Sequence, residues 1–276
     1  MITFQQYLTG KHLLTVGARQ WCLANWDYMV KPMPLFGSSI KVEKGAEKRD
    51  TKILYLQPAG KVSLRTICDG AVAAGCEGPC LISSGQLGMS TGQRAATKRT
   101  IILLLAPAVF EQSVLREIDK AEKRAEKTGI PALFRLNGTS DIDFSSIIRQ
   151  RPRSDFYDYS KVLSRLRKNT LSNYHITFSG SMYSKQSKAA LAKAVARNHT
   201  IAVAYNTKLI ASDNITIPKH LADFDDSDLR PLDSAGTIGA LKRKGSNKLE
   251  RAAEGYKSFF VTAHNHVEFE NIIAKG

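Results

Sequence analysis

Strand-like and helix-like segments alternate along the second half of the chain, and this alternation limits the possible folds more than any other feature. Strands are predicted at residues 132–137, 155–159, 174–178 and 200–205, where β-branched and aromatic residues gather. Helices are predicted between them, at residues 144–150, 161–168 and 185–197. Further strands are predicted at residues 52–57, 237–241 and 257–262. Strands that alternate regularly with helices are typical of parallel βα units.

These repeats predict a parallel (β/α) barrel-like core, complete or incomplete, in a domain that spans residues 51–276. An open doubly wound α/β sheet is the alternative, because the spacing of the elements does not separate the two architectures. Residues 1–50 are expected to form an irregular N-terminal extension, since glycines and prolines interrupt them. The chain has 276 residues, of which 43% are hydrophobic, so it is long enough to bury a core of this size.

Two further helices are predicted ahead of the repeats. Ser90 and Gln93 have the spacing of a capping box, which predicts that a short helix begins there. Pro107 suits the first turn of a second helix, whose apolar residues recur at helical spacing as far as Ala125. Gly129 is expected to end this second helix.

Three of the four cysteines, Cys68, Cys76 and Cys80, lie close together among glycines and alanines. Small residues let the backbone turn tightly, so the three sulfurs can face one point. Three thiolates and an open fourth position suit a [4Fe–4S] cluster, although the spacing C-x₇-C-x₃-C is wider than the C-x₃-C-x₂-C of radical-type enzymes. A structural zinc site would need a fourth ligand from a histidine, an aspartate or Cys22. The sequence predicts a metal site, and leaves iron–sulfur, zinc and simple packing open.

Polar residues follow the predicted strands, and ligands bind at the carboxyl ends of the strands in parallel α/β folds. We expect Arg135 to hold an anionic group and His175 to move a proton. An acid, base or nucleophile is expected among the aspartates Asp141, Asp143 and Asp158. The predicted catalytic set is completed by Asn137 and Lys161.

Each of these residues also has a structural interpretation. Asp141 or Asp143 could cap the helix that begins near residue 144, because aspartate is a favoured N-cap residue. Asp158 could pair with Lys161 or with Arg135. His175 could be a hydrogen-bonded histidine of the core. The sequence does not choose between the catalytic and the structural roles.

The chain carries 40 lysines and arginines against 25 acidic residues, a net charge of +15, which favours nucleic acid as a partner. No apolar run is long enough to cross a bilayer and no signal peptide is recognisable, so no membrane contact and a cytoplasmic location are expected. The oligomeric state stays open. We expect nucleic acid to contact one basic face formed by Arg149, Arg151, Arg153, Arg165, Arg167, Lys168, Lys242, Arg243 and Lys244.

Several motifs in order resemble a bacteriophage family of proteins of unknown function. Besides the cysteines, they are Arg135-Leu-Asn-Gly-Thr-Ser-Asp141, Phe156-Tyr-Asp-Tyr-Ser-Lys161 and Asn173-Tyr-His-Ile-Thr-Phe-Ser179. One departure is that no proline follows Cys68. The resemblance implies a phage origin, and therefore the cytoplasm of the host cell. The pattern is also distantly similar to barrels that carry out radical chemistry.

The leading interpretation is an enzyme that acts on nucleic acid or nucleotides, by base modification or by radical-type chemistry with S-adenosylmethionine. The alternative is a non-catalytic DNA-binding or replication accessory protein with a structural zinc site. A structural component of the virion is a third class. Neither a Ser-His-Asp arrangement at a nucleophile elbow nor a His-Glu-x-x-His motif is present, so ordinary hydrolases fit the sequence less well.

Overall fold

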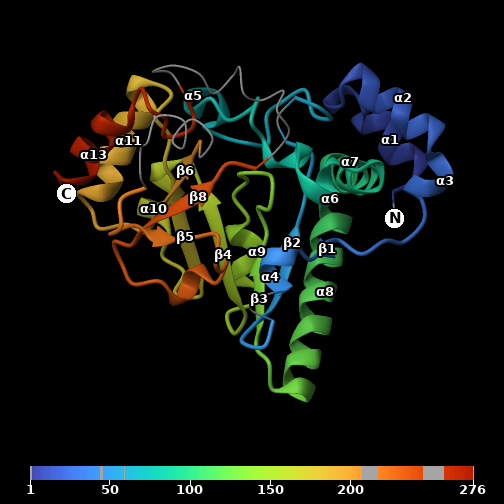
Figure 1. Cartoon of the computed structure of the whole chain (residues 1–276). Helices are drawn as coiled ribbons and strands as arrows, with labels where there is room; N and C mark the ends of the chain where they lie inside the picture. Colours follow the sequence, from blue (N-terminus) through green and yellow to red (C-terminus); the bar gives the residue numbers. More distant parts are fainter. Residues whose placement is uncertain (1, 44–45, 59, 207–216, 245–257, 276) are drawn as a thin grey trace.

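A computed structural model describes residues 2–43, 46–58, 60–206, 217–244 and 258–275 (Figure 1). One eight-stranded sheet lies at its centre, with the strand order β1-β2-β3-β4-β5-β6-β8-β7. Neighbouring strands are parallel throughout, except that β1 runs antiparallel to β2. The strands are β1 (Phe36–Gly37), β2 (Asp50–Leu54), β3 (Ala132–Arg135), β4 (Asp155–Ser160), β5 (Tyr174–Ser179), β6 (Ile201–Tyr205), β7 (Ala222–Asp223) and β8 (Ile238–Lys242).

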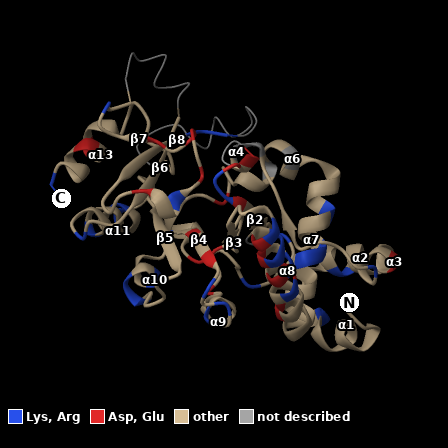
Figure 2. Ribbon diagram, turned by 90° about the horizontal axis from the view of Figure 1, so that it is seen from below, with Lys and Arg blue, Asp and Glu red and all other residues tan. Residues whose placement is uncertain are grey.

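Strands β2 to β6 follow one another in the sheet in the same order as in the chain. Because parallel crossovers are right-handed, connections that all advance in one direction place their helices on one face of the sheet. Figure 2 shows these helices in an arc along that face. They are α8 (Pro107–Thr128), α9 (Ser145–Arg149), α10 (Leu163–Lys168) and α11 (Lys185–Val195).

The predicted parallel βα alternation is therefore confirmed, and the one-sided helices differ from the doubly wound alternative, which needs helices on both faces. The sheet is not closed, so a barrel is not confirmed: β1 and β7 stand at its two edges. The predicted strand at residues 257–262 begins outside the described residues, and residues 258–262 contribute only a single bridge, between Val261 and Tyr205.

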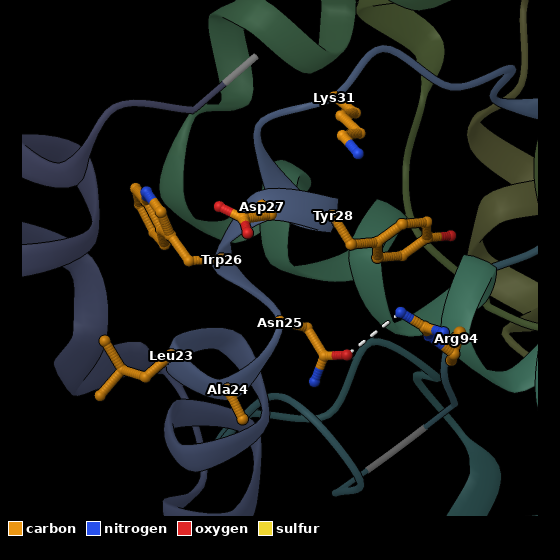
Figure 3. Close-up of a pocket in the computed structure, with 8 residues that line it drawn as sticks. All are labelled: Leu23, Ala24, Asn25, Trp26, Asp27, Tyr28, Lys31 and Arg94. Carbon is orange, nitrogen blue, oxygen red and sulfur yellow. Dashed lines mark hydrogen bonds between the residues drawn. The ribbon is translucent and has the colours of Figure 1, made fainter.

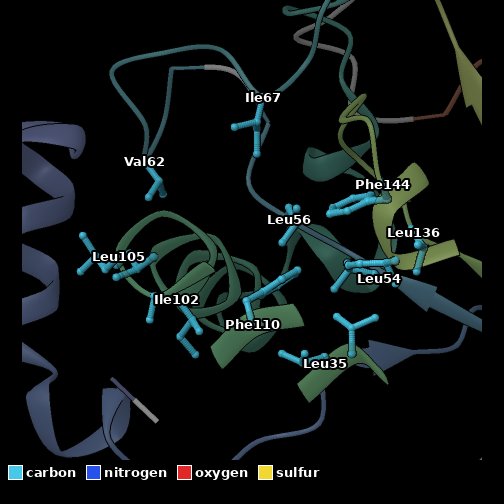
Figure 4. Packing of buried hydrophobic residues seen from close by; sticks show 14 of the residues in the cluster. Leu35, Leu54, Leu56, Val62, Ile67, Ile102, Leu105, Phe110, Leu136 and Phe144 are labelled. Atoms are coloured by element: carbon cyan, nitrogen blue, oxygen red, sulfur yellow. The ribbon is translucent and has the colours of Figure 1, made fainter. Parts of the chain in front are cut away.

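Side chains along each strand alternate between the two faces of the sheet, which gives the two faces different characters. On the helix-covered face, Leu54, Leu136 and Phe144 pack with Ile102 and Phe110 from the helices (Figure 4). A second hydrophobic cluster continues this layer beneath α11 and α13 (His266–Ile273). The opposite face, here called the inner face, carries polar side chains from β3, β4 and β5, and residues 228–232 pack over it.

The long helices differ in how well the sequence predicted them. Helix α8 begins at Pro107 and ends at Gly129, whose φ of 71° is left-handed, as predicted. Helix α7 (Ser90–Leu105) was expected to be short, but its apolar residues carry it over 16 residues. The capping box at Ser90 is wrong, because Ser90 is already inside the helix and Met89 precedes it without a side-chain cap.

The N-terminal segment is not irregular, as the sequence analysis expected, but largely helical. Thr3 forms a capping box with Gln6 and starts the first helix. Gly10 lies so close to α7 that an added Cβ would be 2.6 Å from the side chain of Leu105, so only glycine fits there without a shift. The segment contains α1 (Phe4–Gly10), a 3₁₀ turn at Lys11–Leu13, α2 (Val16–Ala24), α3 (Trp26–Met29) and α4 (Ile40–Glu43). Within the described residues, no helix has the length and apolar character needed to cross a membrane.

Candidate functional site

The cysteine segment, residues 67–80, lies over the carboxyl ends of β3, β4 and β5. Its first part is joined to the loop after β3, where the backbone N–H of Asp141 donates to the carbonyl of Ile67 at 2.9 Å. Its helix, α5 (Ala71–Ala74), is held by hydroxyls that follow β5: Ser181 donates to the carbonyl of Ala74 and Ser184 to that of Ala73, each at 2.7 Å. Three consecutive strands therefore fix the position of the segment.

Two glycines in this segment have left-handed backbones at places of close approach. At Gly75, φ is 67° and an added Cβ would lie 2.4 Å from the ring of Tyr183. At Gly70, φ is 78° and an added Cβ would lie 3.1 Å from the Cβ of Lys161. Glycine is the residue that tolerates both conditions. The small residues that the sequence analysis associated with a tight turn are therefore required by the packing.

Lys161 lies close enough to the three cysteines to interact with them electrostatically. It directly follows β4, and its Nζ lies 5.8 Å from the ring centroid of Phe259. Burial alone would lower the pKa of Lys161, but negative charge on Cys76, on Asp141 and on Cys68 and Cys80 outweighs it, so its pKa is raised. The structure thus brings together four residues that the sequence analysis singled out.

The three cysteines are partly buried and none is in a disulfide. Burial raises the pKa of the Cys80 thiol, and the positive charges of Lys161 and Lys61 act against this rise. Among the described residues, no group of three or more histidines, cysteines, aspartates or glutamates is arranged to hold a single metal ion. Cys22, considered above as a fourth ligand, is buried in α2, at the other side of the molecule from α5 (Figure 1).

Asp141 connects the cysteine segment to the end of β4. Its carboxylate accepts from the Ser160 hydroxyl at 2.9 Å, from the backbone N–H of Lys161 at 3.0 Å and from Arg165 at 2.8 Å. The other arm of the Arg165 guanidinium donates to Asp69, in the cysteine segment, at 2.9 Å. Burial raises the pKa of Asp141, and Arg165 and Lys161 partly offset that effect. Asp69 and Arg165 were not part of the predicted catalytic set, and their pairing links segments that no local pattern relates.

The other two predicted aspartates lie in different surroundings. Asp143 accepts from the backbone N–H of Ser145 at 2.9 Å, and its hydrogen bonds to Ser145 lower its pKa. The N-cap interpretation is wrong, because Phe144 is the N-cap of α9 and no side chain caps it. Asp158 is buried on the helix-covered face, and accepts from Asn137 at 2.7 Å and 3.0 Å and from the Tyr174 hydroxyl at 2.9 Å. Burial raises the pKa of Asp158 to about 6. The structure therefore separates Asp158 and Asn137 from the inner face.

Arg135 stands on the inner face and is paired with Asp228, which was not part of the predicted catalytic set. The guanidinium lies 3.2 Å from the Asp228 carboxylate. The same carboxylate accepts from the hydroxyls of Tyr157 at 2.7 Å and Tyr159 at 3.0 Å. The Arg135 guanidinium also stacks 4.6 Å from the ring centroid of Tyr159. Burial, and then the negative charge at Asp228, raise the pKa of both tyrosines.

His175 lies beside this group, since it pairs in register with Tyr157, and Thr177 pairs with Tyr159. Burial, followed by the positive charge of Arg230, lowers the pKa of His175, so its neutral form is favoured. Three buried polar atoms of this region have no hydrogen-bond partner within the described part of the chain: Arg135 Nε, His175 Nε2 and Thr177 Oγ1. Such atoms need an explanation, and a bound ligand or water is one.

The predicted basic residues lie at opposite ends of the sheet. Arg149, Arg151 and Arg153 precede β4, and Arg167 and Lys168 precede β5, so all of these lie at the amino ends of the strands. The remaining predicted group, Lys242 to Lys244, lies at and beyond the carboxyl end of β8. It therefore does not extend the first patch.

Ion pairs further reduce the predicted patch. Arg151 donates to Asp119 through two nitrogens, at 2.7 Å and 2.9 Å, and Arg165 is held by Asp141 and Asp69. The side chains that remain exposed at the amino ends are Arg149, Arg153, Arg167 and Lys168.

A sequence profile for gene product 88 matches residues 37–258. The chain belongs to the gene product 88 family. This assignment agrees with the resemblance to a bacteriophage family, and the match includes the cysteine segment and all the parallel strands. Helices α1 to α3 precede the matched region. Searches of curated proteins and of solved structures found no match.

Proposed function

We propose that this gene product 88 protein is an iron–sulfur enzyme that acts on nucleic acid, with Cys68, Cys76 and Cys80 as ligands of a [4Fe–4S] cluster. The observation that carries the proposal is that three thiols of one loop, none in a disulfide, lie close enough to Lys161 for their charge to raise its pKa, over the carboxyl ends of parallel strands. Ligands bind at this end of the strands in parallel α/β folds.

The donor set suits a cluster better than zinc. A structural zinc ion needs four closely placed ligands, and the described residues offer no such group. A cluster is larger than one ion, so its cysteine ligands stand further apart. It is also held by thiolates, whose negative charge a neighbouring ammonium group offsets. Lys161 supplies such an ammonium group, since the charges of the three cysteines and of Asp141 raise its pKa.

When bound by three thiolates, a [4Fe–4S] cluster supplies an iron that is open to a small molecule and can transfer one electron. The protein supplies the surroundings. Lys161 balances the charge of the thiolates, and Asp141 fixes Lys161 by accepting from its backbone N–H. The ring of Tyr183 packs against the turn at Gly75. S-adenosylmethionine is the small molecule that we would test first.

The inner face is the proposed substrate side. We infer that the sheet is an incomplete (β/α) barrel, because its strands are sequential and its helices lie on one face. His175 is the proposed proton carrier, since its neutral imidazole is favoured and its Nε2 has no partner within the described residues. Arg135 is already paired with Asp228, so we propose that it positions the two tyrosines and does not hold a substrate anion by itself. We assign Asp158 and Asn137 to joining β3 and β4.

Nucleic acid as the substrate is supported by the net charge of +15. The experiment combines anaerobically purified protein, a reductant, S-adenosylmethionine and DNA oligonucleotides, with nucleosides analysed by mass spectrometry. A nucleoside of altered mass is expected with the wild type and with Cys22→Ala, and none with Cys76→Ala. DNA binding without product, together with one zinc per chain, would instead support the accessory-protein alternative.

A further inference from the structure

A second site lies in the N-terminal helical part, away from the cysteines. A cavity of about 550 Å³ opens between α3 and α7, and Figure 3 shows the ring of Tyr28 between the side chains of Lys31 and Arg94, which line the cavity with it. The Arg94 guanidinium is fixed there, because it donates to Asn25 Oδ1 at 3.1 Å and lies 4.6 Å from the ring centroid of Tyr28. The matched family region covers Arg94 but not Tyr28 or Lys31.

Lys98 adds a buried positive charge next to this cavity. Its side chain is fully buried, and its Nζ donates to the backbone carbonyls of Tyr28 and Lys31. The same ammonium group lies 4.5 Å from the ring centroid of Tyr28. Burial, and then the charge of Lys31, lowers the pKa of Lys98 to about 8. Lys98 therefore holds the backbone that carries Lys31 and still contributes charge at neutral pH.

These three cations have no carboxylate to neutralise them. None of Lys31, Arg94 and Lys98 forms an ion pair within the described ranges of the chain. Asp27 also lines the cavity, but it is exposed and points away from the space between Lys31 and Arg94 (Figure 3). Lys98 is a buried charge, whereas Lys31 and Arg94 are exposed. Together the three positive charges give the cavity a positive potential that attracts an anion.

We propose that this cavity binds a phosphate group of a nucleic acid strand or of a nucleotide, with Arg94 and Lys31 as its contacts. Arg94 presents several N–H donors in a plane that matches phosphate oxygens, and Lys31 contributes a mobile point charge. The proposal rests on the nucleic-acid part of the proposed function, but not on the cluster. It places a phosphate contact on helices that lie outside the βα core.

The test measures binding of a fluorescent 15-nucleotide oligothymidylate, of thymidine monophosphate and of inorganic phosphate to the full chain at several salt concentrations. The variant is Lys31→Ala/Arg94→Ala. Its control is Lys120→Ala/Lys127→Ala, which removes two exposed positive charges from α8. The control therefore has the same net charge as the variant. If both side chains contact phosphates, the variant should bind oligothymidylate at least about 10-fold more weakly, and the slope of log K against log salt should flatten by about 2.

The outcomes separate the sources of the phosphate and the two proposals. If the variant loses binding of oligothymidylate alone, the site binds a nucleic acid strand. If it also loses binding of thymidine monophosphate, the site binds a nucleotide as well. Either result supports the proposed site. If the variant binds like its control while the wild type binds DNA, the cavity proposal is overturned and the nucleic-acid function stands. If the wild type binds none of the three probes at low salt, both are overturned. Circular dichroism of Lys31→Ala/Arg94→Ala and of its control checks that the helices remain folded in both.

Discussion

The guanidinium of Arg135 lies 3.2 Å from the carboxylate of Asp228, across 93 residues of sequence. This contact ties the end of β3 to the segment that packs over the inner face. Both side chains are largely buried, with 13% and 7% of their surfaces exposed. The pair therefore helps to hold residues 228–232 against the inner face, where the Asp228 carboxylate also accepts from Tyr157 and Tyr159.

Removing one partner of this pair should destabilise the fold strongly. Asp228→Ala leaves the Arg135 charge buried without its carboxylate, so the free energy of unfolding should fall by about 3–5 kcal/mol. Urea denaturation measures this change. The control is Lys188→Ala, which removes an ion pair whose carboxylate partner, Glu268, is half exposed, and which should cost about 1 kcal/mol or less. Equal losses for the two variants would contradict the structural role of Asp228.

Asp158 should make stability depend on pH. Its pKa is raised to about 6 by burial, so between about pH 4 and pH 6 the folded state holds a proton that the unfolded chain has lost. The contribution of this group is therefore present at low pH and is lost as pH rises through about 6. The loss amounts to roughly 2–3 kcal/mol over that range.

Asp158→Asn tests this pH dependence, because asparagine has a similar shape and does not titrate. Urea denaturation at half-unit pH steps should show that the difference between wild type and variant changes in this interval and is constant above it. A constant difference from pH 4 to pH 8 would mean that Asp158 is ionised throughout.

Gly75 should be intolerant of any side chain. Gly75→Ala places a Cβ on a left-handed backbone and against the ring of Tyr183, so a loss of at least about 1–2 kcal/mol is expected. Gly17→Ala is the matched control, because nothing lies within 4 Å of its added Cβ and it begins a helix; this variant should be unchanged or slightly more stable. Thermal unfolding compares the two. If Gly75→Ala melts at the same temperature as the wild type, the cysteine segment does not pack closely against Tyr183.

Lys161 should matter for metal retention more than for folding. Lys161→Met removes the charge that balances three thiolates, so the purified protein should lose most of its iron, while Lys161→Arg keeps the charge and should keep more. Iron per chain, measured for the three proteins after the same anaerobic purification, tests this. Equal iron in Lys161→Met and wild type would remove Lys161 from the proposed site.

The sequence predicted local features well and distant relationships poorly. The amphipathic stripe between Pro107 and Gly129 predicted α8, and the alternation of segments predicted parallel βα units. Closure of the sheet into a barrel could not be read from spacing, because it depends on whether the first and last strands pair with each other. In the structure, β1 and β7 stand at opposite edges. The N-terminal helices were missed because their glycines and prolines were taken as breaks, although the Thr3 and Gln6 pair was a readable start signal.

The candidate site shows the same division. The clustering of the cysteines was visible in the sequence, and so were the polar residues that follow the strands. The pairing of Arg135 with Asp228 and that of Arg165 with Asp69 join residues more than 90 positions apart, and no local pattern records such a contact. Asp158 shows the opposite error. Its neighbours in the sequence suggested a strand end, whereas the register turns its carboxylate toward Tyr174 on the helix-covered face.

The measurement that tests the central claim most directly is the iron and acid-labile sulfide content of anaerobically purified protein, with electron paramagnetic resonance after reduction. We predict about four iron and four sulfide per chain, and a signal typical of a reduced [4Fe–4S] cluster. Both should be lost when Cys68, Cys76 and Cys80 are replaced together by alanine, and kept in Cys22→Ala. Zinc in place of iron, no metal after anaerobic reconstitution, or a cluster that survives the triple replacement would contradict the account.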